Sequence, residues 1–346
     1  MCIIAGYNGT KRAAPLIIEM LRKTEGIDAG CYTGIATLHE GKIHYRKLAG
    51  NLDRLLAETD AMELPGNIGI IHSRTPGESD TEGVEYAHPF VTRREGEAVA
   101  AMVLNGTAGC FKPRRAERVE ITERLLREGA VIPSLCEGTG NLNLPGGRCV
   151  HSSDVFCQLA DQHVQAGMDV PAALAKTFSE LPTEAVVLML SLIKPDAIAY
   201  ARLNFPMHLA FCDHGAYLST TPQVFPSDAR DYTLLPVLSA GYIYRDRFES
   251  SPFPICPATV APLNPARRHR IYEVICDKLA EGEQTVSTLA EAIRHVFEGY
   301  DCGQVGAAIY QVLDDLQREG RLLQRVEYIK GQFEGLQAPL VYLSVC

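Results

Sequence analysis

The sequence predicts an α+β protein in which β-sheets pack together and helices cover them. Short apolar runs of strand length are numerous, and most of them are bounded by Gly, Asn or Pro. Segments with helical periodicity are fewer. Apolar residues make up 46% and charged residues 22% of the 346 residues, which is ordinary for a globular protein with a sizeable core. Many strands and few helices favour a layered domain.

The individual elements follow from these periodicities. Strands are expected at Cys2–Ala5, Cys31–Leu38, Ile43–Leu48, Ile68–His72, Ala98–Asn105, Ala185–Ile193, Ala197–Arg202, Met207–Cys212, Ala216–Ser219 and Gly241–Tyr244. Helices are expected at Pro15–Arg22, Ala116–Arg127 and Ser153–Ala166. Pro15 suits a first helical turn, where its missing N–H costs nothing.

The pattern changes near Ser251. The stretch "SSPFPICPATVAPLNP" is rich in proline and has no periodic face, so it reads as a linker. Helical patterns and then two β-like runs follow it, at Ala266–Ala280, Val286–Phe297, Gln304–Glu319, Leu322–Tyr328 and Leu340–Val345. Three helices before a hairpin is the order of a winged helix. We therefore predict domains at 1–250 and 266–346, joined by a linker at 251–265.

Charge argues against nucleic acid as a partner. The formal net charge is −9, and residues 262–346 hold nine Lys/Arg against twelve Asp/Glu. The expected recognition helix, "GQVGAAIYQVLDDLQRE", carries one arginine and three acids. Because DNA binding depends on neutralising phosphates, the pattern favours a module for protein interaction or dimerisation over a DNA reader.

The eleven cysteines are scattered, odd in number and never spaced as C-x-x-C. They read as reduced thiols of a cytoplasmic protein. No His and Cys set has zinc-finger spacing, so neither a metal nor a cofactor is predicted. No apolar run reaches 18 residues, and no basic segment precedes a cleavable apolar stretch. We expect no membrane span and no secretory signal.

The start of the chain, "MCIIAGYNG", suggests a nucleophile. If the initiator methionine is trimmed, Cys2 carries a thiol and a free α-amine on one residue. The thiol can attack an amide carbonyl while the α-amine takes and returns the proton. An α-amine has an ordinary pKa of about 7.7–8.0, close to the working range of a general base.

Other residues suit the remaining roles. Arg74, in "GIIHSRTPGESD", ends an apolar strand, and a guanidinium can hold a carboxylate through two parallel hydrogen bonds. Asn105 and Gly106, in "AAMVLNGTAG", offer a side-chain amide and an uncrowded N–H for an oxyanion. Asp154 falls in the first turn of a helix and could receive an ammonium group. Each also has a structural alternative. Arg74 could form a surface ion pair, Asn105 and Gly106 could form a turn, and Asp154 could interact with the helix dipole.

Five stretches in order resemble the class II glutamine amidotransferases, which are N-terminal-nucleophile hydrolases. They are "MCIIAGYNG", "DAGCYTGIATLHEGKIHYRKLAGNLDRL", "GIIHSRT…AHPF", "LNGTAG" and "SSDVF". The nearest resemblance is to the glutaminase domain of isomerising glucosamine-6-phosphate synthase, over about Met1–Phe248. It implies a four-layer αββα sandwich and glutamine hydrolysis with no cofactor.

The resemblance also implies residue roles. Cys2 is the nucleophile, and Asn105 with the Gly106 N–H forms the oxyanion hole. Arg74 binds the α-carboxylate of glutamine, Asp154 binds its α-ammonium, and His88 in "AHPF" supports the pocket.

The chain also departs from the family pattern. The aromatic residue and the Thr-His pair that follow the arginine in the family are missing, which leaves Thr75 or Ser79 to supply a hydroxyl. Too few residues follow Ser251 for the sugar isomerase half, so ammonia is expected to pass to a separate synthase subunit, or the chain is a stand-alone hydrolase. Two alternatives stay open: a non-catalytic amino-acid sensor, and a hydrolase of a different amide.

Overall fold

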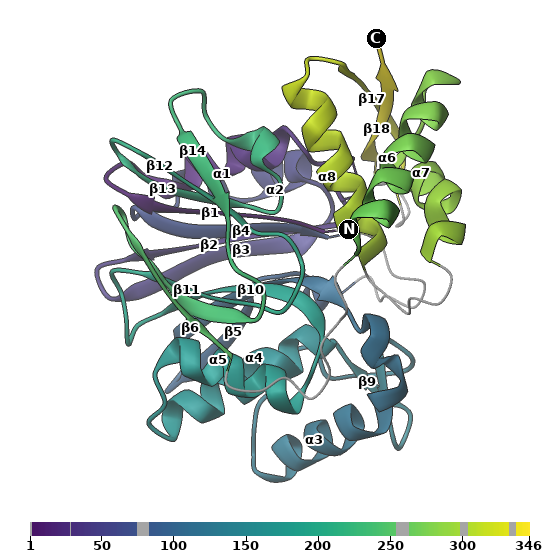
Figure 1. Ribbon diagram of the computed structural model, residues 1–346. Helices are drawn as coiled ribbons and strands as arrows, with labels where there is room; N and C mark the ends of the chain where they lie inside the picture. The colour runs from purple at the N-terminus through teal and green to yellow at the C-terminus, as the bar shows by residue number, and fades with distance from the viewer. Residues whose placement is uncertain (1, 28, 75–82, 254–262, 298–303, 332–336) are drawn as a thin grey trace.

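The computed structural model describes the chain except residues 1, 28, 75–82, 254–262, 298–303 and 332–336. Two β-sheets lie face to face, and helices cover their outer sides (Figure 1). The predicted packing of sheets beneath helices is therefore confirmed. No described helix combines the length and the apolar character needed to cross a bilayer.

The first sheet has seven antiparallel strands in the order β14-β12-β13-β1-β4-β2-β3. Their bounds are β1 Ile3–Gly9, β2 Tyr32–His39, β3 Lys42–Ala49, β4 Ile68–Arg74, β12 His208–Cys212, β13 Gly215–Ser219 and β14 Arg230–Leu234. The strand that begins after Cys2 therefore lies at the centre of the sheet, between β13 and β4.

The second sheet has six antiparallel strands in the order β16-β15-β11-β10-β6-β5. Their bounds are β5 Phe90–Arg94, β6 Glu97–Thr107, β10 Glu184–Ser191, β11 Ile198–Arg202, β15 Ser239–Ile243 and β16 Phe248–Pro252. The register of β6 on β10 pairs Asn105 with Val186 and Gly106 with Ala185.

Side chains of the central strands alternate between two apolar layers. In β1, Ile4 joins the core between the sheets, whereas Ile3 and Ala5 face the outer helices. In β6, Val103 points between the sheets, whereas Leu104 packs under the helices of the other side. This period of two is why strands buried on both faces read as continuous apolar runs in the sequence.

Helices cover both outer faces. On the seven-stranded sheet lie α1 (Ala13–Arg22) and α2 (Leu52–Glu58). Beneath the six-stranded sheet lie α4 (Ser152–Gln165) and α5 (Val170–Glu180), with α3 (Arg115–Arg127) beside them (Figure 1). Short 3₁₀ turns complete this part of the chain: η1 Ala61–Glu63, η2 Val84–Tyr86, η3 Gly109–Arg114 and η4 Pro222–Val224.

The insert before α4 folds as a small three-stranded sheet in the order β7-β9-β8. Its strands are β7 Cys136–Glu137, β8 Leu142–Leu144 and β9 Arg148–Val150. The short strands and the glycines between them gave the sequence no clear period, which is why no strand was predicted here.

The C-terminal part contains the predicted order of three helices and a hairpin. The elements are α6 Pro265–Ala280, α7 Val286–Ile293, η5 Arg294–Phe297, α8 Gln304–Arg318, β17 Leu322–Lys330 and β18 Gln337–Val345. Asn264 caps α6, and Thr285 forms a capping box with Thr288 at the start of α7. Most of the expected linker lies outside the described residues, and the assignment as a winged helix stays a prediction.

Candidate active site

Cys2 lies at the end of the central strand pair of the seven-stranded sheet. The antiparallel register of β1 on β4 pairs Ile3 with Ser73, so the next residue pair along it is Cys2 with Arg74. Cys2 is half-buried, and Arg74 is 7% exposed. Cys2 and Arg74 are separated by 72 positions in the chain, and they come together because one strand begins and the other ends at the same end of the sheet.

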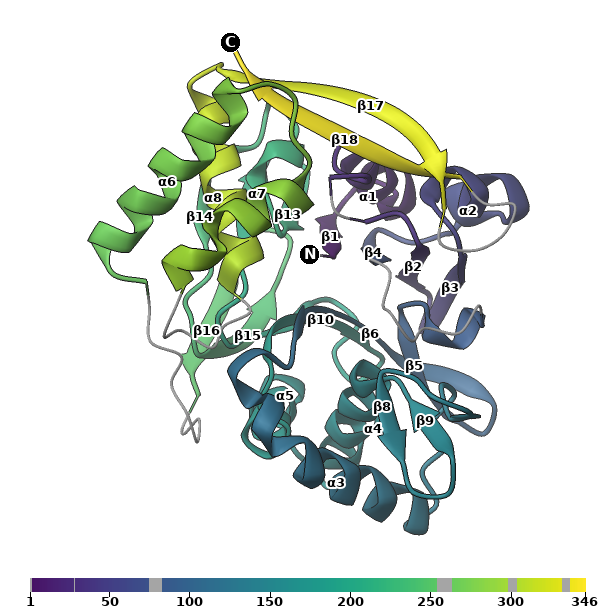
Figure 2. The same ribbon diagram turned by 90° about the vertical axis from the view of Figure 1, so that its right-hand side faces the viewer.

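A cavity of about 580 Å³ opens at this edge. Among its lining residues are Cys2, Arg74, His88 and Gly106, four of those that the sequence predicted. Figure 2 looks toward the ends of β1 and β4 on one side and of β6 and β10 on the other. The site is therefore built from the ends of strands of both sheets.

Asn105 and Gly106 lie at the end of β6, opposite Cys2. The Asn105 side chain is 1% exposed, and its Nδ2 donates a hydrogen bond to the Cys2 backbone oxygen at 2.7 Å. Gly106 lines the cavity, and a Cβ there would lie 2.3 Å from the Glu184 carbonyl oxygen. Only glycine fits at this position, so the close pairing of β6 with β10 dictates the residue.

Arg74 is fixed by contacts on two sides. Its guanidinium lies 5.0 Å from the ring centroid of Tyr32, a cation–π distance. Its Nη1 donates to the Tyr86 backbone oxygen at 3.4 Å. These contacts position a cation on the wall of the cavity, where a carboxylate of a ligand could bind.

Three histidines pack together at the cavity, and two of them, His88 and His151, line it. The His88 ring lies 3.9 Å from that of His72 and 5.6 Å from that of His151. Burial, with His72 as a further cause, holds the pKa of His88 well below its usual range. Burial and the nearby Arg74 do the same to the pKa of His151. Both rings are therefore neutral near pH 7, and they support the pocket without adding charge.

Asp154 is fully buried. Its carboxylate accepts hydrogen bonds from the Ser134 N–H at 2.8 Å and the Gln158 side chain at 3.0 Å. Burial raises the pKa of this carboxyl. Asp154 is not among the residues that line the cavity, whereas its neighbours Ser152 and Ser153 are. Its role in binding an ammonium group stays a prediction.

One wall of the cavity is cationic. Lys112, Arg115 and Arg118 line it at intervals of three residues along η3 and α3. Arg118 is 7% exposed and donates to the Pro182 backbone oxygen and to the Thr183 hydroxyl. No Asp or Glu is among the described residues that line the cavity. Thr75 and Ser79, the predicted sources of a hydroxyl, lie outside the described residues.

Relatives of known activity match this chain. It is 28% identical over 253 residues to "Glutamine--fructose-6-phosphate aminotransferase [isomerizing]" of Pyrococcus horikoshii, covering 72% of this chain and 37% of the relative. It is 30% identical over 225 residues to the protein of the same name from Zymomonas mobilis, covering 64% of this chain and 32% of the relative. The chain is a homologue of the glutamine amidotransferase domain of glucosamine-6-phosphate synthase. It spans about a third of the length of these enzymes.

Two solved structures share the fold of this amidotransferase homologue. One is glutamine phosphoribosylpyrophosphate amidotransferase from B. subtilis, with a TM-score of 0.58, 12% identity and coverage of 94% of this chain and 66% of the other. The second is described as the allosteric regulatory enzyme of purine biosynthesis, with a TM-score of 0.61, 11% identity and coverage of 100% and 71%. At these identities the likeness shows the fold alone. No protein-family profile matches the chain.

Two features of the site in this amidotransferase homologue were not predicted from the sequence. The cationic wall was not predicted, although the three-residue spacing of Lys112, Arg115 and Arg118 in "KPRRAER" could have indicated a shared helical face. His72 and His151 were not predicted either. They come from a strand and from the cap of α4, and no local pattern connects them.

Proposed function

We propose that the chain hydrolyses the side-chain amide of glutamine, with Cys2 as the nucleophile. The observation that carries the proposal is the meeting of Cys2, Arg74 and Gly106, from three strand ends, around one cavity. Homology to enzymes that by name use glutamine supports the choice of substrate. The reaction requires removal of Met1, which exposes the α-amine of Cys2.

The chemistry proceeds in two stages. The Cys2 sulfur attacks the amide carbon while the α-amine accepts the thiol proton, and a tetrahedral oxyanion forms. The α-amine then passes that proton to the departing nitrogen, ammonia leaves, and a γ-glutamyl thioester remains on Cys2. Water attacks the thioester, the α-amine again carries the proton, and glutamate leaves as the thiol is restored. Arg74 holds the α-carboxylate throughout.

Asn105 can serve two roles at once. A side-chain amide nitrogen carries two hydrogens, and one of them is bound to the Cys2 backbone oxygen. The other has no partner among the described residues and can donate to the oxyanion beside the Gly106 N–H. Removing one such donor typically costs about 2.7–4 kcal/mol of transition-state stabilisation. The same amide therefore both fixes the nucleophile's backbone and stabilises the developing charge.

The cationic wall favours a second candidate, an amide that bears an acid group but no ammonium. Arg74, Lys112, Arg115 and Arg118 offer four cations, and the described lining offers no carboxylate for an ammonium group. An ω-amide of a dicarboxylic acid has this charge pattern. Comparing glutamine with glutaric acid monoamide separates the candidates. A higher kcat/KM for glutamine supports glutamine, and a higher value for the monoamide supports the second candidate.

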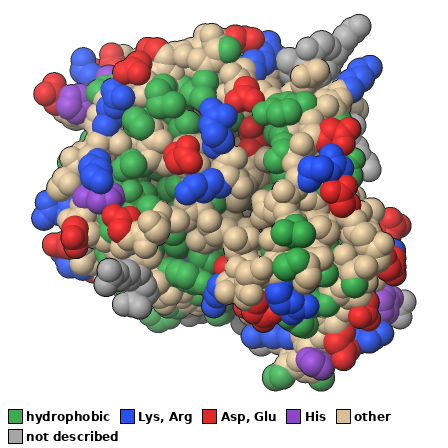
Figure 3. Space-filling model, turned by 90° about the horizontal axis from the view of Figure 1, so that it is seen from above, with side chains coloured by type: hydrophobic (Ala, Val, Ile, Leu, Met, Phe, Trp, Pro, Cys, Tyr) green, Lys and Arg blue, Asp and Glu red, His purple; other side chains and the backbone are tan. Residues whose placement is uncertain are grey.

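The fate of the ammonia belongs to the proposal as well. Because the relatives that the chain matches are by name glutamine-dependent aminotransferases, we propose that a partner synthase receives the ammonia. For residues 266–346 we propose a winged-helix-like module that binds protein, supported by the order of its elements. Figure 3 shows Lys/Arg and Asp/Glu side chains interspersed on the face seen from above, with no broad basic surface for nucleic acid there.

The test combines labelling with turnover. The protein is treated with 6-diazo-5-oxo-norleucine, and its intact mass is measured together with glutamate release from glutamine. We expect loss of Met1, a single adduct that maps to Cys2, and glutamate release that Cys2→Ala abolishes. Cys276→Ser, a half-buried cysteine of α6, serves as the matched control and should behave as wild type. Glutamine binding without turnover by the trimmed protein would support the sensor instead.

A further inference from the structure

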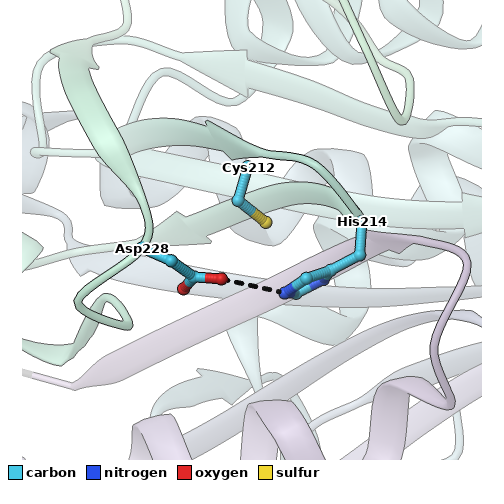
Figure 4. A group of neighbouring side chains, drawn as sticks. All are labelled: Cys212, His214 and Asp228. Carbon is cyan, nitrogen blue, oxygen red and sulfur yellow. Dashed lines mark ion pairs between the residues drawn. The ribbon is translucent and has the colours of Figure 1, made fainter.

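A second group of reactive side chains lies at the other end of the seven-stranded sheet. Cys212 ends β12, His214 lies in the turn to β13, and Asp228 lies in the segment before β14. One ligand atom from each lies within 4.8 Å of the other two. Figure 4 shows the sulfur directed toward the space between the imidazole and the carboxylate. A thiol, an imidazole and a carboxylate thus converge from two segments of the chain.

Tyr7 determines which nitrogen of His214 carries the proton. The Tyr7 hydroxyl donates its one hydrogen to the His214 backbone oxygen at 2.7 Å. The same hydroxyl oxygen lies 3.2 Å from His214 Nδ1, so Nδ1 must be the donor in that contact. In the neutral ring Nε2 then carries the lone pair, and it faces Asp228 Oδ2 at 3.6 Å.

Two electron-pair donors face each other in this arrangement, and the Cys212 sulfur is a third. A proton on Nε2 would account for the imidazole and the carboxylate as an ordinary ion pair. It would leave the Cys212 sulfur outside the pair: the thiol donates its hydrogen to the Gly215 backbone oxygen at 3.3 Å, while the sulfur is directed toward the space between the imidazole and the carboxylate. A single cation among the three atoms satisfies all of them. We propose that Cys212, His214 and Asp228 form a binding site for a zinc-class divalent metal.

The donor set selects the class of metal. Thiolate, imidazole and carboxylate together suit Zn²⁺, which takes four tetrahedral ligands and here would complete its shell with water. Zinc bond lengths place tetrahedral donors about 3.4–3.6 Å apart. The His214–Asp228 distance of 3.6 Å already meets this, and the Asp228 side chain is 62% exposed, so it can adjust. On binding, the Cys212 thiol releases one proton to solvent, and a sulfur–metal bond replaces its contact with Gly215.

The hydrogen bond from Nδ1 to Tyr7 is the kind of outer contact that orients a metal-bound histidine. Tyr7 lies five residues along β1 from Cys2, about 17 Å at the usual rise of a strand. The metal would therefore join the β12–β13 turn to the segment before β14 without touching the amide-binding cavity. The proposal is independent of the one for Cys2.

The test measures metal binding by the full chain, reduced and freed of metal with a chelator. Zn²⁺ is titrated by calorimetry, and Co²⁺ is used as a spectroscopic probe. We expect one equivalent of Zn²⁺ to bind and Co²⁺ to give a thiolate-to-metal charge-transfer band. Cys212→Ser should abolish that band. Cys212→Ser and Asp228→Asn should each weaken Zn²⁺ binding by at least about tenfold, because even an outer contact is worth that much.

Two matched variants keep the result interpretable. Asp213→Asn changes the exposed acid between Cys212 and His214, and Cys276→Ser removes a half-buried thiol elsewhere. Both should bind Zn²⁺ as wild type does. Failure of wild type to bind an equivalent of Zn²⁺ would overturn the proposal. Undiminished binding by either Cys212→Ser or Asp228→Asn would overturn the three-ligand site as well.

Discussion

At the scale of single residues, Glu25 shows how the end of the central strands is organised. Its carboxylate is 8% exposed and accepts hydrogen bonds from the Leu52 N–H at 2.9 Å and the Ser73 hydroxyl at 2.9 Å. Ser73 precedes Arg74 on β4, so Glu25 supports the strand end that carries the cation of the cavity. Burial raises the pKa of Glu25 to about 7 from its usual 4.5.

This pKa predicts a pH dependence of stability. Between pH 4.5 and about 7 the folded state keeps a proton on Glu25 that the unfolded state has lost, so the free energy of unfolding falls as pH rises. The total effect is on the order of 3 kcal/mol. Glu25→Gln removes this pH dependence. Urea denaturation should therefore show the free energy of unfolding of the variant rising relative to that of wild type between pH 4.5 and about 7. Glu19→Gln, an exposed acid on α1, is the control. Parallel pH profiles for wild type and Glu25→Gln would refute the prediction.

Asp154 provides a second test at this scale. Its two oxygens already accept from Ser134 and Gln158, away from the cavity. Asn at this position turns one acceptor into a donor, so we expect Asp154→Asn to lose about 1–3 kcal/mol of stability. We expect it to change KM for glutamine and for glutaric acid monoamide alike. If only the KM for glutamine rises, Asp154 interacts with the ammonium group after all.

The predicted site residues that line one cavity together include those at strand ends. Cys2 directly precedes an apolar run, and Arg74 and Gly106 come at the ends of such runs, so their approach at one end of the sandwich could be anticipated. Asp154 is different, because its position in the first turn of a helix does not reveal which face is buried. The Cys212, His214 and Asp228 group had no recognisable spacing, since it depends on the approach of a loop to a hairpin.

At the scale of elements, most buried apolar strands and three of the outer helices were predicted, whereas the helix α5 and the exposed edge strand β16 were not. The helix expected at Ala116–Arg127 is observed as Arg115–Arg127, and the strand expected at Ala98–Asn105 as Glu97–Thr107. Edge strands such as β16, whose residues are all exposed, lack the apolar pattern that marks a strand. Pairing with β15 holds β16 in place, and pairing is a property of the fold rather than of the segment.

The C-terminal hairpin shows how one element is attached to the rest. The Val341 N–H of β18 donates to the Gly26 backbone oxygen at 2.8 Å. Gly26 has φ +94°, and a Cβ there would lie 2.9 Å from the Pro339 carbonyl. Glycine is therefore required both by its backbone conformation and by the closeness of the hairpin.

These two requirements can be separated by a pair of substitutions. Gly26→Ala and Gly129→Ala both force alanine into positive φ, at +94° and +87°, but a Cβ at Gly129 meets nothing within 4 Å. Each should lose about 1–2 kcal/mol from backbone strain. Gly26→Ala should lose about 1–3 kcal/mol more, because it pushes against Pro339. Chemical denaturation measures both, and equal losses would show that the hairpin yields without cost.

At the scale of the whole molecule, one hydrophobic core contains residues from both sides of the predicted domain boundary. One apolar cluster contains Ile17 and Leu21 of α1 together with Ile275 of α6 and Leu313 of α8. The linker and the helical periods suggested separate units because a sequence pattern shows which face is apolar but not what it packs against. Packing across the boundary predicts that the chain unfolds in one cooperative transition.

Leu313→Ala tests this cooperativity. Leu313 is fully buried in the shared cluster, so the substitution should cost about 2–5 kcal/mol. The loss should also be visible far from α8. Cys157 is buried in α4 beneath the other sheet, and a thiol reagent reaches it only when that layer opens. Cys157 labelling is mapped by mass spectrometry, and helix content is followed by circular dichroism. We expect the urea midpoints of both signals to fall by the same amount.

Leu323→Ala is the control for that shift, because Leu323 in β17 is 50% exposed and should change stability by no more than about 0.5 kcal/mol. A different outcome would separate the two parts of the chain. If Leu313→Ala lowered the urea midpoint of the helical signal but left that of Cys157 labelling unchanged, residues 266–346 would unfold on their own. The module could then open while the cavity around Cys2 stayed formed, as an interaction module that reports to a partner would require.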